Sequence, residues 1–157
     1  MHSLARAASA AVLVCASTLS LTACSGTVGM TPAPDSNDPA CAAVTVRLPD
    51  VIGELDKRET TAQATGAWGD PAAILLHCGV EPIGPTTMPC FTVNGVDWVR
   101  DDSESPVFRF TTYGRTPAVE VVIDNREASG SALLDLSPAV SVIDQTRSCL
   151  NPEDVTG

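Results

Sequence analysis

The chain has few aromatic and few basic residues. Its 157 residues include 3 Phe, 2 Trp and 1 Tyr, so a folded core must consist mainly of Val, Leu, Ile and Ala. Asp and Glu together number 19 against 9 Lys and Arg, which gives a formal net charge of −10. Nucleic-acid binding depends on Lys and Arg side chains that release phosphate counterions, and the sequence has no basic stripe. We therefore exclude nucleic acid as a partner.

Common catalytic motifs are also missing. The sequence contains no G-x-S-x-G, no H-E-x-x-H, no S-x-x-K, no glycine-rich phosphate loop and no C-x-x-C. Cys78 follows His77, but successive strand residues point to opposite faces, so the two side chains are not expected to act as nucleophile and base. These absences favour a non-catalytic protein without a cofactor. A hydrolase or transferase with an unfamiliar site is the alternative, and a purely structural protein is a third interpretation.

No metal site is expected. His2 and His77 are the two histidines of the chain, whereas a zinc site needs four convergent ligands. The acidic residues between 101 and 104 lack the ordered twelve-residue loop and glycine of a calcium-binding loop. We interpret that acidic stretch as a solvated loop.

The N-terminus has the organisation of a lipoprotein signal peptide. Arg6 precedes an apolar segment over residues 7–21, which is shorter than the ~20 residues that span a bilayer. The segment ends in a sequence typical of a lipobox, Leu21-Thr22-Ala23-Cys24. We predict that residues 1–23 are removed and that Cys24 becomes the first mature residue, with a diacylglyceryl group on its sulfur. An ordinary secretory signal with a chance cysteine is the alternative.

Lipidation of Cys24 predicts attachment to the extracytoplasmic face of the cell membrane. Each buried CH₂ contributes about 0.8 kcal/mol, and two acyl chains hold a protein firmly. The negative net charge repels anionic lipid, so the acyl chains are expected to be sufficient for the membrane contact. A further partner would then be an envelope protein or a wall polymer.

Cysteine usage is consistent with export. Apart from Cys15 in the leader and Cys24, the chain has Cys41, Cys78, Cys90 and Cys149. An even number of cysteines in an oxidising compartment predicts two disulfides, and four cysteines allow three pairings. Sequence alone does not choose among them. We favour a local bond between Cys78 and Cys90 and a bond between Cys41 and Cys149 that joins the ends of the domain.

Composition divides the mature chain into three parts. Residues 24–37 are rich in small and polar residues and are predicted to form a flexible tether with a reach on the order of 20 Å. Residues 38–150 are expected to form one domain, and residues 151–157 a short tail. Asp38 and Pro39 are typical of a helix N-cap and first helical position, and the apolar spacing between 132 and 143 indicates a second helix.

Between these helices the apolar pattern is that of strands. Asn94-Gly95 is the strongest hairpin signal, because a type I′ turn needs positive φ at both central residues. Apolar or alternating runs over 72–78, 107–113 and 119–124 predict further strands. The expected fold class is α+β: a small antiparallel sheet of about four to five strands, with an N-terminal and a C-terminal helix packed on one face and two disulfides.

Five short segments carry a resemblance to a known family. They are Ala67-Trp68-Gly69-Asp70-Pro71, His77-Cys78-Gly79-Val80, the run over 93–99, Thr112-Tyr113-Gly114-Arg115 and the run over 136–140. Over roughly residues 41–150 the chain resembles an actinobacterial family of secreted or lipid-anchored proteins known as domain of unknown function 3515. The resemblance supports disulfides at the four cysteines and implies no activity.

Four residues make up a candidate ligand surface. Asp97 and Trp98 adjoin the hairpin, and Tyr113 and Arg115 belong to a neighbouring turn. An aromatic ring with a few polar groups suits recognition of a peptide or a sugar. The alternative places Trp98 and Trp68 in the core, which is expected of a chain with so few aromatic residues.

Overall fold

The computed structural model describes residues 26–150. The leader, Cys24 and the tail from residue 151 lie outside the described residues. The helices are α1 (Pro39–Thr45) and α2 (Ala132–Val140). The strands are β1 (Val51–Ile52), β2 (Leu55–Arg58), β3 (Thr65–Trp68), β4 (Ile74–Val80), β5 (Cys90–Val93), β6 (Val96–Asp101), β7 (Val107–Thr112) and β8 (Ala118–Asp124).

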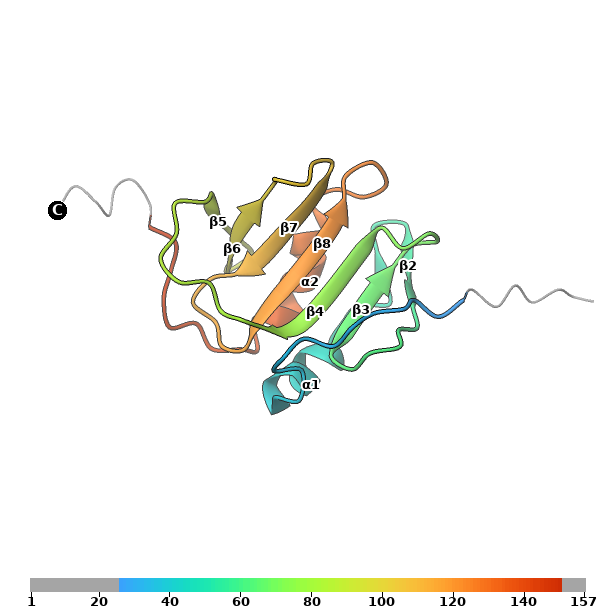
Figure 1. The fold of residues 1–157 in the computed structure, drawn as a ribbon, viewed down its shortest axis with the longest axis horizontal. Helices are drawn as coiled ribbons and strands as arrows, with labels where there is room; N and C mark the ends of the chain where they lie inside the picture. Colours follow the sequence, from blue (N-terminus) through green and yellow to red (C-terminus); the bar gives the residue numbers. More distant parts are fainter. Residues whose placement is uncertain (1–25, 151–157) are drawn as a thin grey trace, which may run out of the picture.

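All eight strands form one antiparallel sheet, in the order β1-β2-β3-β4-β8-β7-β6-β5 (Figure 1). The predicted α+β fold with a sheet of four to five strands is therefore wrong, because residues 26–150 are mostly β and contain two small helices. The prediction missed β1, β2 and β3. Each of these strands has at most 4 residues, too few to show a clear alternation.

One face of the sheet and the two helices enclose the core. On the central strand β4, Ile74, Leu76 and Cys78 are buried and belong to the same hydrophobic cluster as Val44 of α1 and Leu136 of α2. The side chains between them on β4 point to the other face and are partly exposed. The alternation along β4 therefore separates the helix-covered face from a helix-free face.

Two local predictions are confirmed. Asp38 caps α1 by accepting a hydrogen bond from the Ala40 backbone N at 2.8 Å, and Pro39 is the first helical residue. Asn94 and Gly95 join β5 to β6 with φ of 47° and 77°, as the type I′ turn requires.

Part of the predicted tether lies against the sheet. The Val28 backbone N donates to the Glu59 carbonyl at 2.8 Å, and the Asp35 backbone N donates to the Gly79 carbonyl at 2.9 Å. Gly79 has φ of 96°, and a Cβ there would lie 2.4 Å from the Asp35 carbonyl carbon. The glycine thus permits the close approach, and the structured part of the chain begins before residue 38.

The two predicted disulfides are present, but the favoured pairing is wrong. Cys41 is bonded to Cys78, which joins α1 to β4, and Cys90 is bonded to Cys149, with Cα separations of 5.5 and 5.6 Å. The sheet register explains the difference. Cys90 lies in the cross-strand row that contains His77, so it points to the face opposite Cys78. Four strand spacings also separate β4 from β5.

Among residues 26–150, no helix is long and apolar enough to cross a membrane.

Candidate ligand site beside the Cys90–Cys149 disulfide

The segment after α2, residues 141–150, runs back to the edge of the sheet and is called the C-terminal strap here (Figure 1). The Thr146 backbone N donates to the Gly114 carbonyl at 2.7 Å, and Gln145 forms an antiparallel bridge with Arg115. Gly114 has φ of 73°, and a Cβ there would lie 1.9 Å from the Arg147 carbonyl oxygen. The turn after β7 therefore needs glycine for the strap to reach the sheet.

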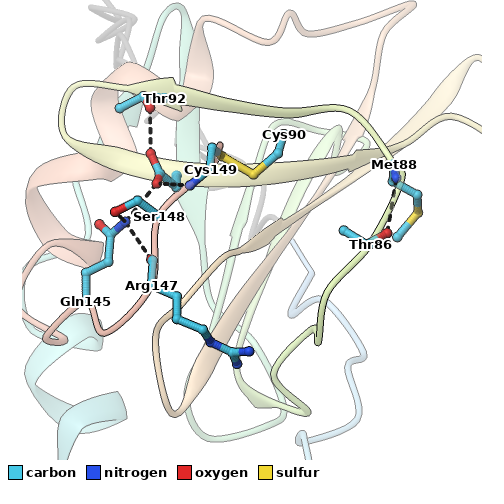
Figure 2. The surroundings of a disulfide bond; sticks show 9 residues. Thr86, Met88, Cys90, Thr92, Gln145, Arg147, Ser148 and Cys149 are labelled. Carbon is cyan, nitrogen blue, oxygen red and sulfur yellow. Dashed lines mark hydrogen bonds between the residues drawn. A yellow bond between two sulfur atoms is a disulfide. The ribbon is translucent and has the colours of Figure 1, made fainter. Parts of the chain in front are cut away.

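The buried carboxylate of Asp97 holds the strap to β6. Its side chain accepts hydrogen bonds from Thr92 Oγ1 at 2.6 Å, Gln145 Nε2 at 2.8 Å and the Cys149 backbone N at 2.7 Å. Figure 2 shows these three donors grouped next to the disulfide. Asp97 has an exposed fraction of 4%, so its carboxylate is satisfied by donors from within the protein and not by solvent.

Arg115 is also buried and hydrogen-bonded within the protein. Its guanidinium donates to the carbonyls of Gly95 and Ile143 and to Gln145 Oε1. Burial lowers the pKa of Arg115, while the nearby carboxylates of Asp97 and Asp144 act in the opposite direction. The side chain therefore ties the hairpin turn to the strap and contributes no exposed charge.

The four residues of the predicted ligand surface do not form one exposed surface. Asp97 and Arg115 come together through Gln145 beneath the strap, both with an exposed fraction of 4%. Trp98 is fully buried in the core, because it points to the opposite face from its neighbour Asp97. Tyr113 alone of the four is partly exposed. Trp68 is also fully buried, and its Nε1 donates to the Pro49 carbonyl at 2.9 Å.

An open pocket of about 240 Å³ lies over the disulfide, and Cys90, Cys149 and Tyr113 contribute to its wall. Its other lining residues are Pro85, Thr86, Met88, Ser148 and Leu150. The Arg147 guanidinium carbon lies 5.7 Å from the centre of the Tyr113 ring, in a cation–π arrangement. The pocket combines an aromatic ring, apolar side chains and hydroxyl groups. Of these residues the sequence predicted Tyr113 but not Met88 or the strap residues. The Cys90–Cys149 disulfide and the hydrogen bonds of the strap to Asp97 and Gly114 bring them together.

A larger hollow of about 430 Å³ lies between the β1–β2 turn and the loop before α2. Its lining includes the cationic side chain of Arg126, which donates to both carboxylate oxygens of Asp124 at 2.9 and 2.6 Å. Arg126 is therefore paired, and the other charged groups of the lining among residues 26–150 are the carboxylates of Glu54 and Glu127. We place the candidate site at the smaller pocket because Tyr113, a residue of the predicted ligand surface, contributes to its wall.

His77 occupies the helix-free face, away from the pocket. Its Nδ1 lies 4.0 Å from Glu120 Oε1, and Arg109 binds the same carboxylate oxygen at 3.3 Å. Cys78 points to the other face and is in a disulfide, so the prediction that His77 and Cys78 do not form a nucleophile–base pair is confirmed. Across residues 26–150, no group of three or more His, Cys, Asp and Glu side chains is placed to hold a metal ion.

Partial burial of His77 predicts a pH-dependent stability. Desolvation lowers its pKa below the usual 6.5, with Glu120 opposing this shift and Arg109 adding to it. Between the two pKa values the unfolded chain binds more protons than the folded one, so the stability falls as the pH drops below about 6.5. We expect His77→Gln to reduce the dependence of the free energy of unfolding on pH between about pH 7 and about pH 5. Urea unfolding at several pH values tests this, and an unchanged slope in the variant would refute it.

Asp124 titrates below that window. The side chain and backbone N–H of Arg126 lower the pKa of Asp124 to about 2, so the stability that this carboxylate contributes is lost as the pH falls from about 4 toward about 2. The effects of His77 and of Asp124 on stability are therefore separable by pH.

Fold and site together define a mostly β, two-disulfide domain with a small pocket at one sheet edge. The sequence matches the family described as "Protein of unknown function (DUF3515)" over residues 3–148. The chain belongs to this family, which confirms the resemblance of its short segments. No curated protein and no solved structure matches the chain.

Proposed function

We propose that this protein is exported, anchored by acyl chains on Cys24 to the extracytoplasmic face of the cell membrane, and binds a partner in the envelope without catalysis. The observation that carries the proposal is the oxidised state of Cys41, Cys78, Cys90 and Cys149. Disulfides of this kind persist mainly in oxidising compartments. The lipobox-like sequence before Cys24 supplies the export signal and the attachment point.

A binding role is favoured because the potentially reactive groups near the pocket have structural tasks. Cys90 and Cys149 are bonded to each other, Asp97 accepts three internal hydrogen bonds, and Arg115 donates to carbonyl groups. The groups left to meet a ligand are the Tyr113 ring, the apolar rim and hydroxyls. Such a set supports recognition by shape, stacking and a few hydrogen bonds.

The composition of the pocket rim favours a protein partner over a wall polymer. Met88 and Leu150 are 39% and 78% exposed at the rim, and Arg147 lies over Tyr113. Tyr, Met and Arg are enriched in protein interfaces. A pocket of this size would receive one side chain of the partner, with the rim residues packing around it.

Site-specific photo-crosslinking in intact cells tests the proposal. A photoreactive residue at Met88 or Leu150 is expected to give the same discrete crosslinked protein, and Tyr113→Ala is expected to abolish it. A photoreactive residue at Val46, which is 79% exposed and follows α1, is the control and is expected not to give that product. Products that do not depend on position, or that survive Tyr113→Ala, would contradict a binding site at this pocket. A product containing wall polymer would show that the partner is carbohydrate.

A further inference from the structure

The first described residues are fixed to the end of β2 by a set of hydrogen bonds, called the N-terminal clamp here. The Val28 backbone N donates to the Glu59 carbonyl at 2.8 Å, and the Thr61 backbone N donates to the Val28 carbonyl at 3.0 Å. Thr61 Oγ1 accepts from the Met30 backbone N at 2.9 Å. Both backbone groups of Val28 are thus hydrogen-bonded, the N–H to Glu59 and the carbonyl to Thr61, and Met30 is bonded to the Thr61 side chain.

Arg58 extends the clamp toward the N-terminus. One guanidinium nitrogen donates to the Gly26 carbonyl, and the other donates to the Gly69 carbonyl at 2.8 Å. The second nitrogen also lies 2.9 Å from a carboxylate oxygen of Asp70. Because Asp70 and Gly69 hold the guanidinium in place, Gly26 is fixed relative to the sheet.

The clamp leaves very little free chain beside the proposed anchor. Two Cα steps separate Cys24 from Gly26, which is at most about 7 Å of extended chain. A flexible tether over residues 24–37 would instead reach on the order of 20 Å and allow every orientation. A lipid on Cys24 therefore brings the β2 end of the sheet next to the headgroups.

The Cys90–Cys149 pocket lies at the other end of the sheet. Six strand spacings separate β2 from β5, which is about 29 Å at ~4.8 Å per spacing. Figure 1 shows the first described residues beside β2 and β3 and the C-terminal strap near β5 and β6, at opposite ends of the molecule. The anchored chain lacks Arg6 of the leader and has a formal net charge of −11, so contact of its whole length with an anionic leaflet is unfavourable.

We infer that the anchored protein stands on the bilayer in one orientation, with the N-terminal clamp and β2 next to the headgroups and the pocket projecting away from the membrane. The inference rests on lipidation of Cys24, as in the proposed function. It assigns the membrane-facing surface to residues 54–61 and 26–30. A partner would then reach the pocket from the side of the envelope that is remote from the bilayer.

Paramagnetic relaxation measures this orientation. The lipidated protein, extracted from membranes, is placed in anionic nanodiscs that carry a gadolinium chelate on a fraction of the headgroups. Amide signals of residues 54–61 and 26–30 are expected to broaden strongly, while those of residues 86–92 and 145–150 keep most of their intensity. Equal broadening at both ends, or stronger broadening near the pocket, would overturn the inference.

A lengthened variant serves as the matched control. Ten Gly and Ser residues inserted after Ser25 leave the clamp intact but separate it from the anchor. The difference in broadening between the two ends is expected to shrink at least severalfold. An unchanged difference would mean that something other than the short connection orients the protein, which also overturns the inference.

A second arm separates this inference from the proposed function. Residues 26–150 contain the complete sheet, both helices and both disulfides, so a chain that begins at Cys24 retains the whole described fold. Its Cys24 thiol is free for coupling to a maleimide lipid. If the coupled chain shows the gradient but cells yield no lipidated protein, anchoring in the cell is wrong and the clamp geometry is right. If natural lipidation is found and broadening is uniform, the orientation is wrong and anchoring stands.

Discussion

Replacing Cys90 and Cys149 together by alanine is expected to lower the free energy of unfolding by about 4 kcal/mol. The disulfide joins positions 59 residues apart, and the chain-entropy estimate for a loop of this length is about 4 kcal/mol. Small domains have a total stability of about 5–15 kcal/mol, so the loss is a large share of the margin. Urea unfolding followed by the fluorescence of Trp68 and Trp98, both fully buried, measures the change.

Removing the other disulfide is the matched control. Cys41 and Cys78 are 37 residues apart, so the double alanine variant is expected to lose a similar amount, again about 4 kcal/mol. The variants differ in hydrogen exchange. Loss of Cys90–Cys149 is expected to unprotect the amides of Thr146 and Cys149, whereas loss of Cys41–Cys78 leaves them protected. Equal exchange of the strap in both variants, or a loss below about 1 kcal/mol, would contradict the role given to this bond.

Gly114→Ala is expected to destabilise the protein by about 4 kcal/mol. At φ of 73° a Cβ is strained, and it would lie 1.9 Å from the Arg147 carbonyl oxygen. Either the strap or the turn must move, which breaks the hydrogen bond from the Thr146 N to the Gly114 carbonyl and disturbs the donors on Asp97. A loss of this size is typical of overpacking combined with broken buried hydrogen bonds.

Gly95→Ala isolates the backbone strain from the clash. Gly95 has φ of 77°, but nothing lies within 4 Å of a Cβ built on it. We expect this variant to lose only about 1 kcal/mol, the cost of a left-handed alanine. Thermal and urea unfolding of the two variants side by side give the comparison. If Gly114→Ala and Gly95→Ala lower the free energy of unfolding equally, the close approach of the Arg147 carbonyl to Gly114 does not limit the side chain at this position.

Local signals in the sequence predicted the elements that depend on neighbouring residues. Asp38-Pro39 and Asn94-Gly95 set a cap and a turn through their own backbone preferences, and both occur where expected. The sequence predicted β4 from an apolar run over 72–78 and β8 from the alternation over 119–124, and each of these strands has 7 residues. β1 has 2 residues, too few for a pattern of its own, and is formed by pairing with β2.

Contacts between segments that are distant along the chain could not be predicted from the sequence. The pairing of Cys90 with Cys149 follows from the strap crossing to the sheet edge, and the burial of Asp97 and Arg115 follows from the same strap. The residues before α1 look like a linker because they are small and polar. They are nevertheless bound through backbone groups such as the N–H and carbonyl of Val28, which composition does not reveal.

We propose that a lipid on Cys24 holds this disulfide-bonded domain on the outside of the membrane. Mass spectrometry of the N-terminal peptide, from protein extracted from membranes of the native cells, tests this proposal. We expect a chain that begins at Cys24 and carries a diacylglyceryl group on its sulfur. An intact leader, or an unmodified N-terminus at another residue, would contradict the claim.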